Sequence, residues 1–275
     1  MMRVALETKR PRRTQIASVV SLPAPIGGWN ARDSIAKMPP LDAVEMENWF
    51  PGTTSLAVRG GYSRWSTGYP AAVETVMVWT GPSSSKLFGV SNSAIYEATA
   101  GGAIGAALVS SLGNSRFQYV NFATTGGAYI IAVNGSSVCR QYDGTNWHKD
   151  GDGAPWDITG VSSASLINVT AYKNRLWFVE KNKLKLWYLP IQAIGGAATS
   201  FDLSSIFSLG GYIVSIATQT IDAGYGVDDY MCIITSEGEV ACYRLTDPTT
   251  PTGIALVGIF VIGRPCPSQI RSTLQ

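Results

Sequence analysis

The chain carries a repeat of short apolar segments between residues 73 and 262. Each unit contains an apolar strand, a polar link, a second strand, a tight turn and a third strand. The first strands begin at residues 73, 116, 165 and 212, so successive units start 43, 49 and 47 residues apart. Periods of about 40 to 50 residues are typical of β-propeller blades. The sequence therefore predicts an all-β protein, built as a β-propeller of about four blades of four strands.

Turn chemistry supports the same interpretation. Asn134-Gly135 provides the positive φ angles that a two-residue hairpin requires. A fourth, outer strand is predicted in each unit, at residues 104–110, 156–161, 201–207 and 255–262. Whether four blades close a ring or the propeller is incomplete stays open. A β-sandwich or an irregular β domain is the alternative fold.

Composition reduces the number of functions to consider. The chain has one histidine, His148, and its four cysteines form no CxxC pair. Catalytic triads and multi-histidine metal sites need more imidazole than this. We therefore expect no enzyme activity, no metal and no cofactor. No apolar stretch approaches the roughly 18 residues of a membrane span, so we expect a soluble protein of a reducing cytosol.

Three alternatives concern acidic and thiol side chains. Asp150 and Asp152 alternate in a turn as calcium ligands do, but an ordinary surface turn is favoured, with His148 as a nearby loop residue. A glycosidase would need paired carboxylates in the central cleft of the propeller, for which Asp222, Asp228 and Asp229 are the only candidates. A two-residue turn at 237–238 would place Cys232 and Cys242 on opposite faces of their hairpin, which disfavours a disulfide.

The region before the repeat has a different character. Asp42 followed by Glu45 matches a capping box and predicts a short helix that continues through Asn48. The predicted organisation is an extended basic arm (1–25), an N-terminal docking region with this helix (26–70), the propeller repeats (71–265) and a C-terminal tail (266–275).

The arm concentrates the positive charge of the chain. Five basic residues against Glu7 give the first thirteen residues a charge of +4, and since the whole chain has +2, the rest carries −2. Clustered basic side chains bind polyanions, so the arm is predicted to contact DNA phosphates or an acidic partner surface, unless it is simply solvated. The residues assigned to partner contact are Lys9, Arg10, Arg12 and Arg13.

Eight tryptophans also need an explanation. Trp79 and Trp177 lie in predicted strands and are assigned to the core between blades. Trp29 and Trp49 lie outside the repeats and are assigned to an interface, where aromatic side chains are enriched. A glycan-binding surface is the alternative role for such exposed rings.

Several motifs outside the strand pattern resemble a known family. They occupy residues 25–34, 38–44, 47–51, 58–62, 142–147 and 256–265. In these segments the chain resembles the tail nozzle, tail-tube or packaged-DNA stabilisation proteins of short-tailed bacteriophages, whose members are generally longer.

The resemblance implies a structural virion protein of the phage tail, assembled in the host bacterial cytoplasm. It implies a ring of six copies below the portal and adaptor proteins, around a channel through which DNA passes without specific binding. A carbohydrate- or receptor-binding propeller is the alternative function. The residues expected to form the assembly interface are Trp29, Arg32, Asp33, Trp49, Phe50 and Arg59.

Overall fold

A computed structural model describes residues 23–222 and 227–265 of the chain. The predicted C-terminal tail and most of the predicted arm, including the four basic residues assigned to partner contact, lie outside these ranges. The chain divides into two compact units, Met1–Arg64 and Trp65–Gln275. The boundary precedes the predicted one because β5 (Ser66–Thr67) pairs in parallel with β9 (Gly102–Ala103) of the second unit. Trp65 belongs there too, since its indole Nε1 donates to the Ala98 carbonyl at 2.8 Å.

The N-terminal unit consists of two small pairs of strands. β1 (Gly28–Trp29) pairs in parallel with β2 (Asp42–Ala43), and β3 (Trp49–Pro51) pairs antiparallel with β4 (Leu56–Val58).

The predicted helix from Asp42 through Asn48 is wrong. The Asp42 carboxylate accepts a hydrogen bond from Asn30 Nδ2 at 2.7 Å instead of capping a helix. Asn48 has a φ of 59°, in the left-handed region, which ends any right-handed helix there. Contacts between segments distant in sequence outweigh a local capping signal worth only about 1 kcal/mol.

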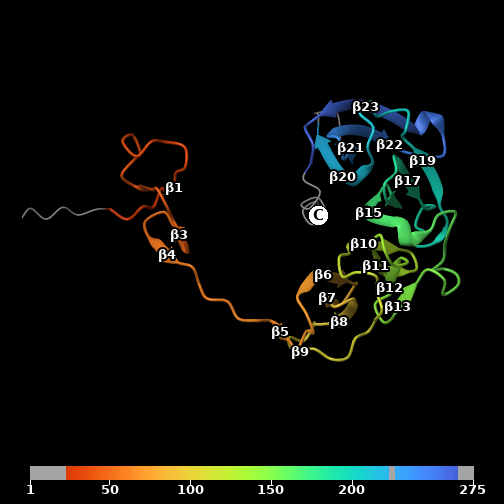
Figure 1. Ribbon diagram of the computed structural model, residues 1–275, viewed down its shortest axis with the longest axis horizontal. Coiled ribbons are helices and arrows are strands. Elements are labelled where there is room, and N and C mark those ends of the chain that lie inside the picture. The colour runs from red at the N-terminus through yellow and green to blue at the C-terminus, as the bar shows by residue number, and fades with distance from the viewer. Residues whose placement is uncertain (1–22, 223–226, 266–275) are drawn as a thin grey trace, which may run out of the picture. The chain divides into compact units, whose positions relative to one another are not determined.

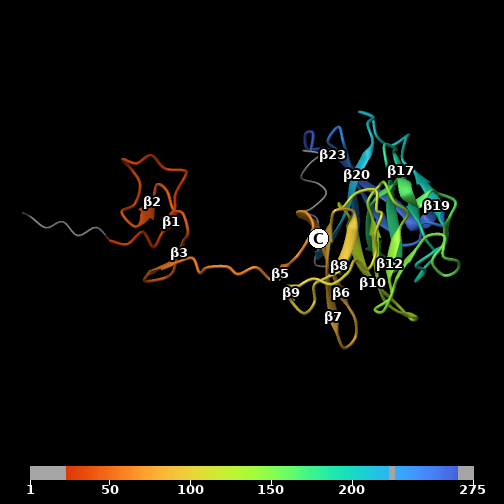
Figure 2. The ribbon, with the colours of Figure 1, turned by 60° about the horizontal axis from the view of Figure 1, so that its bottom comes forward.

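The second unit contains four antiparallel sheets, each formed in chain order. They follow one another around an arc, as Figures 1 and 2 show. The first two sheets contain β6 (Val73–Thr80), β7 (Ser85–Ser91) and β8 (Ala94–Glu97), then β10 (Gln118–Thr124), β11 (Gly127–Val133), β12 (Arg140–Tyr142) and β13 (Trp147–Lys149). The other two contain β15 (Leu166–Tyr172), β16 (Arg175–Glu180), β17 (Lys185–Tyr188) and β19 (Thr199–Asp202), then β20 (Ile213–Asp222), β21 (Val227–Thr235), β22 (Glu239–Leu245) and β23 (Ile254–Val261). This arrangement confirms the predicted all-β propeller architecture.

Short elements connect the sheets. β14 (Ile158–Thr159) pairs in parallel with β18 (Gly196–Ala197), as β5 pairs with β9. Two 3₁₀ helices, η1 (Ser163–Ser165) and η2 (Pro251–Gly253), are the only helices in the described ranges. Neither has the length or the apolar character needed to cross a membrane.

The outer strands follow the prediction in two of the four sheets. β23 lies within one residue of the predicted 255–262 segment, and β19 overlaps the start of 201–207. In the second sheet the outer strand is β13, because the turn at Asp143 returns the chain directly onto β12, so the prediction of 156–161 is wrong. In the first sheet, the predicted segment contributes only the isolated bridge from Val109 to Ile95.

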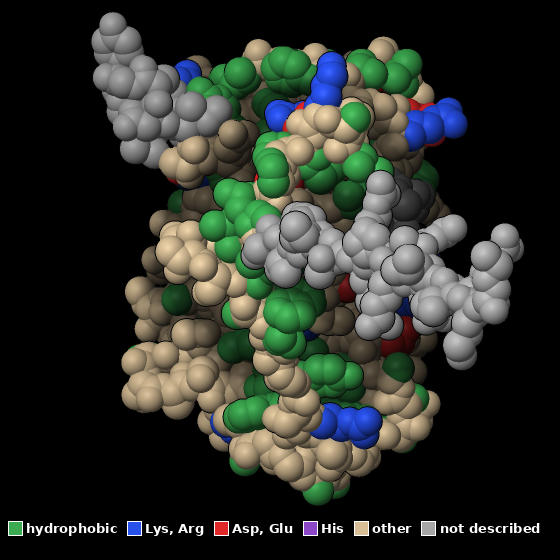
Figure 3. Space-filling view, turned by 90° about the vertical axis from the view of Figure 1, so that its left-hand side faces the viewer, with side chains coloured by type: hydrophobic (Ala, Val, Ile, Leu, Met, Phe, Trp, Pro, Cys, Tyr) green, Lys and Arg blue, Asp and Glu red, His purple; other side chains and the backbone are tan. Residues whose placement is uncertain are grey.

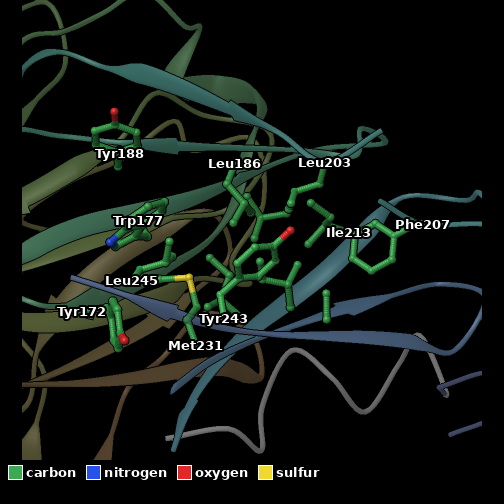
Figure 4. Close-up of a cluster of buried hydrophobic side chains, with 14 residues drawn as sticks. Tyr172, Trp177, Leu186, Tyr188, Leu203, Phe207, Ile213, Met231, Tyr243 and Leu245 are labelled. Carbon is green, nitrogen blue, oxygen red and sulfur yellow. The ribbon is translucent and has the colours of Figure 1, made fainter. Parts of the chain in front are cut away.

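Three hydrophobic clusters fill the spaces between neighbouring sheets. Trp79 belongs to the cluster between the first and second sheets, and its Nε1 donates to the Ala128 carbonyl at 2.9 Å. Trp177 is 1% exposed in the cluster between the third and fourth sheets, beside Tyr188 (Figure 4). Both tryptophans therefore have the core role that the sequence predicted.

Candidate assembly surface

The described part of the N-terminal unit, residues 23–64, has no apolar core of its own. Among residues 23–64, the part of this unit that the structure describes, no hydrophobic side chain is buried. Ordering a residue costs about 1–2 kcal/mol of backbone entropy, and apolar burial is the main term that offsets this cost. Units of roughly 40 residues usually need a disulfide, a metal or association to be stable, and residues 23–64 include no cysteine. These residues are therefore suited to folding against a partner.

Large apolar side chains of this unit point to solvent. Trp29 is 69% exposed, Phe50 59% and Trp49 47%. Ile35, Leu41, Val44, Val58 and Tyr62 are exposed as well. Exposed aromatic side chains are enriched in the buried centre of protein interfaces. The structure thus places the three predicted aromatic residues where a partner can reach them.

A hydrogen-bonded turn positions the predicted polar residues. Asn30 Oδ1 accepts from the backbone N–H of Arg32 and of Asp33, both at 3.1 Å, and its Nδ2 donates to Asp33 Oδ2 at 3.0 Å. Arg32 Nε lies 3.1 Å from Asp33 Oδ1. The hydrogen bonds from Arg32 and from Asn30 lower the pKa of Asp33 below its ordinary value. Asn30 is a site residue that sequence reasoning missed, although Asn is a common turn-former.

Arg59 lies elsewhere in the unit. It follows β4, and its backbone N–H donates to the Asn48 carbonyl at 2.7 Å. This bond extends the β3–β4 ladder by one step and involves only the main chain of Arg59. The predicted interface role of its side chain stays a prediction.

A shallow hollow lies beside the exposed Trp49 side chain. It is lined by Pro25, Glu45, Met46, Glu47, Trp49 and Leu56. An apolar floor beside two carboxylates suits a segment that carries both an apolar and a basic side chain. No sequence pattern predicts this hollow, because it forms only when residues 45–49 follow an extended path.

A second exposed apolar surface lies on the outer strand of the fourth sheet. Leu256, Val257, Phe260 and Val261 of β23 are 43%, 54%, 54% and 69% exposed. Figure 3 shows one face of the molecule on which hydrophobic side chains are numerous and charged ones sparse. An edge strand of this kind invites pairing or packing with another surface. The continuous apolar run from residue 254 to 262 indicates a strand in the sequence. Only its position at the edge of the sheet leaves its apolar side chains exposed.

His148 lies in β13, so its prediction as a loop residue is wrong, and a polar cluster surrounds it. His148 Nε2 lies 3.0 Å from Asp143 Oδ2, and the imidazole stacks on the Trp156 indole with ring centroids 3.8 Å apart. Asp143 Oδ1 also accepts from the backbone N–H of Thr145 and of Asn146. A carboxylate thus lies beside this histidine, which the sequence did not predict. The contacts describe a turn held by side chains, next to the outer strand of the second sheet.

The Asp150–Gly153 segment forms a similar turn. The Asp150 carboxylate accepts from Ser163 Oγ at 2.5 Å and from the Ile158 N–H at 2.9 Å. Asp152 Oδ2 accepts from the Lys149 N–H at 2.9 Å. Over residues 23–222 and 227–265, no three metal-ligating side chains gather at one point.

In the part of the chain that the structure describes, no pair of carboxylates forms at the candidate glycosidase aspartates. Asp229 forms an ion pair with Lys173 and accepts from Thr220 Oγ1 at 2.8 Å. These two hydrogen bonds lower the pKa of Asp229. The side chains of Asp222 and Asp228 lie outside the part of the chain that is described.

Comparison with known proteins gives fold-level likenesses. No protein-family model and no curated protein sequence matches the chain. Two structures of BBS1N in complex with ARL6DN, soaked with mercury and with lead, are similar at TM-scores of 0.43, with 13% and 11% identity over 75% and 70% of this chain. YCF48 bound to the D1 peptide is similar at a TM-score of 0.41, with 13% identity over 82% of this chain. The likenesses span 63%, 56% and 61% of those chains, less than two thirds of each, and at this level they establish no family or function.

Proposed function

We propose that this protein is a structural component of a bacteriophage tail, without catalytic activity, that assembles into a ring around the DNA channel. The observation that carries the proposal is the N-terminal unit, which exposes three aromatic side chains and buries no hydrophobic one among residues 23–64. The motifs in residues 25–34, 38–44, 47–51 and 58–62, which resemble phage nozzle proteins, all lie in this same unit.

A ring needs two different surfaces on each copy. In a heterologous contact, one patch of a subunit binds a different patch of the next, and repetition closes the ring. The N-terminal unit, which exposes the side chains of Trp29, Trp49 and Phe50, is proposed to provide one such patch. The apolar edge strand β23, on the other unit, is a surface of matching chemistry.

Charge is also compatible with a conduit for DNA. Residues 14–275 carry a net charge of −2. A wall that attracted phosphates strongly would retain the genome through counterion release, whereas a nearly neutral wall lets it slide. The basic residues Lys9, Arg10, Arg12 and Arg13 are assigned to contacts with the portal, the adaptor or other tail proteins. In this proposal the protein resides in the virion tail after assembly in the bacterial cytoplasm.

The test is the oligomeric state of the purified chain and of a double variant. Sedimentation velocity and negative-stain electron microscopy of the unaltered protein are expected to show rings with a central pore. The double variant Trp49→Ala, Phe50→Ala removes about half of the surface of each of these side chains from the contact. Roughly 100 Å² lost from each ring at about 25 cal/mol/Å² amounts to about 2.5 kcal/mol per residue.

That loss weakens assembly by about 60-fold for each substitution. Ile191→Ala is the control, since Ile191 is 61% exposed but lies in the other unit, outside both proposed patches. If the double variant still forms rings at the same concentration, the assignment of Trp49 and Phe50 to the interface is wrong. A monomer that binds glycans on an array would instead support the receptor-binding alternative.

A further inference from the structure

Two cysteines face each other across the last hairpin of the propeller. Cys232 on β21 is the direct cross-strand partner of Cys242 on β22, and their Sγ atoms lie 3.1 Å apart. This corrects the sequence prediction, in which the two thiols lay on opposite faces.

The correction comes from the length of the turn. The loop between β21 and β22 holds three residues, 236–238, instead of two. Gly238 has a φ of +88°, and Thr235 Oγ1 hydrogen-bonds the backbone of Glu239 at both its N–H and its carbonyl. One extra loop residue shifts the register by one and turns every side chain of β22 to the other face.

The sulfur pair lies on the side of the fourth sheet that faces away from the third. Neighbouring residues Met231, Ile233, Ala241 and Tyr243 are buried in the cluster shared with the third sheet, as Figure 4 shows for Met231 and Tyr243. Since side chains alternate along a strand, Cys232 and Cys242 project from the opposite face. Both are only partly buried, whereas Cys139 is fully buried. A small oxidant can therefore reach the pair.

We propose that Cys232 and Cys242 are a reversible dithiol–disulfide site whose oxidant is a disulfide of the glutathione class. One thiolate attacks a sulfur of glutathione disulfide, which forms a mixed disulfide and releases one glutathione. The second thiolate then attacks the protein sulfur of the mixed disulfide, so that the intramolecular bond forms and the second glutathione leaves. The two protein thiols lose two electrons and two protons, and glutathione disulfide takes up both to become two thiols.

The geometry favours the intramolecular step. The two sulfur atoms already lie 3.1 Å apart, and forming the bond needs a further approach of about 1 Å, to the usual 2.05 Å separation. Burial, together with the hydrogen bond to Cys242, raises the pKa of the Cys232 thiol to about 12. Little Cys232 thiolate is present at neutral pH, so attack by this sulfur accelerates as the pH rises.

The consequence of oxidation is a covalent link between β21 and β22. These strands carry the hairpin to which the edge strand β23 is attached. Closing this loop restricts the unfolded chain and holds the β22–β23 edge in register. The oxidised protein therefore unfolds at a higher temperature than the reduced one.

The experiment uses the full chain with Cys266→Ser, which leaves three cysteines. After incubation with glutathione disulfide at pH 8, titration of thiols in denaturant is expected to fall from three per chain to one. Peptide mapping under non-reducing conditions should find one cross-linked species joining Cys232 to Cys242, and dithiothreitol should restore all three thiols. The melting temperature should rise on oxidation and return on reduction.

Cys232→Ser and Cys242→Ser are the matched controls. Each should stop at a glutathione adduct on the remaining thiol, with no cross-linked peptide and no reversible rise in melting temperature. Circular dichroism of the reduced variants shows whether each is folded. If the folded three-cysteine chain retains all its thiols, or joins a different pair, while the urea-unfolded chain oxidises under the same conditions, the proposal is wrong.

Discussion

Replacing Trp79 by alanine tests whether the sheets of the second unit pack as propeller blades. Trp79 is 7% exposed, and its ring lies edge-on to Tyr142 of the second sheet, with ring centroids 5.8 Å apart. Gly81 and Gly144 pack so closely on the indole that a Cβ on either would come within 3 Å of it. The side chain therefore fills a space between two sheets that cannot collapse onto a smaller residue.

The expected loss of stability follows from these contacts. Truncating a buried Trp to Ala costs about 3–5 kcal/mol, because it removes apolar burial and leaves a cavity. Loss of the hydrogen bond from Nε1 to the Ala128 carbonyl adds about 1 kcal/mol. For a unit of this size, each kcal/mol lowers the melting temperature by about 2–4 °C. The Trp79→Ala protein should therefore melt roughly 10–20 °C below the unaltered one.

Val78→Ala is the matched control, one position away on the same strand. Val78 points to the other face of β6 and is 38% exposed, so its truncation should cost less than about 1 kcal/mol. Its backbone bonds with Tyr119 and Asn121 persist in the variant, since they involve only main-chain atoms of residue 78. Thermal unfolding followed by circular dichroism, with urea titration as a second measure, compares the two. Similar losses in both variants would refute the assignment of the two faces of β6.

Three further predictions concern turns. Hydrogen bonds from the following turn and from His148 outweigh burial, which acts in the opposite direction, and lower the pKa of Asp143. The stability that this carboxylate contributes is therefore present above its unfolded pKa of about 3.9 and is lost as the pH falls through the folded pKa. Asp143→Asn should flatten the fall in melting temperature below about pH 4. An unchanged profile of melting temperature against pH would contradict this. Gly144 has a φ of +99°, and the Cβ of an alanine there would lie 2.6 Å from the Trp79 ring. Gly144→Ala should therefore lower the free energy of unfolding in urea by about 2 kcal/mol or more. An unchanged free energy of unfolding would mean that the turn has a different conformation. The Glu239 carboxylate is 2% exposed and accepts hydrogen bonds from the Ser208 N–H, the Ser208 hydroxyl and the Leu209 N–H. Glu239→Gln should therefore speed hydrogen exchange at residues 208–209. Unchanged protection would show that the carboxylate does not hold this loop.

Local patterns were enough to predict most of the second unit. Alternating apolar residues and Gly- or Asn-containing turns place the start of the first strand of each unit within two residues of the start of β6, β10, β15 or β20. They also assign Trp79 and Trp177 to the core. Alternation works at this range because side-chain direction within a strand has a period of two, whatever the partner strand is.

Only the tertiary structure decides which strands pair and in which register. A turn of two residues and a turn of three can both end in a glycine with positive φ, so the sequence around Gly238 did not reveal that Cys232 lies opposite Cys242. The Asp42 capping signal likewise yields to pairing with Gly28, because contacts between distant segments exceed a single cap in free energy. Exposure is decided in the same way, since Trp49, Phe50 and Trp79 are all aromatic residues in apolar strands. Only the presence or absence of a neighbouring sheet makes one of them core and the other two surface.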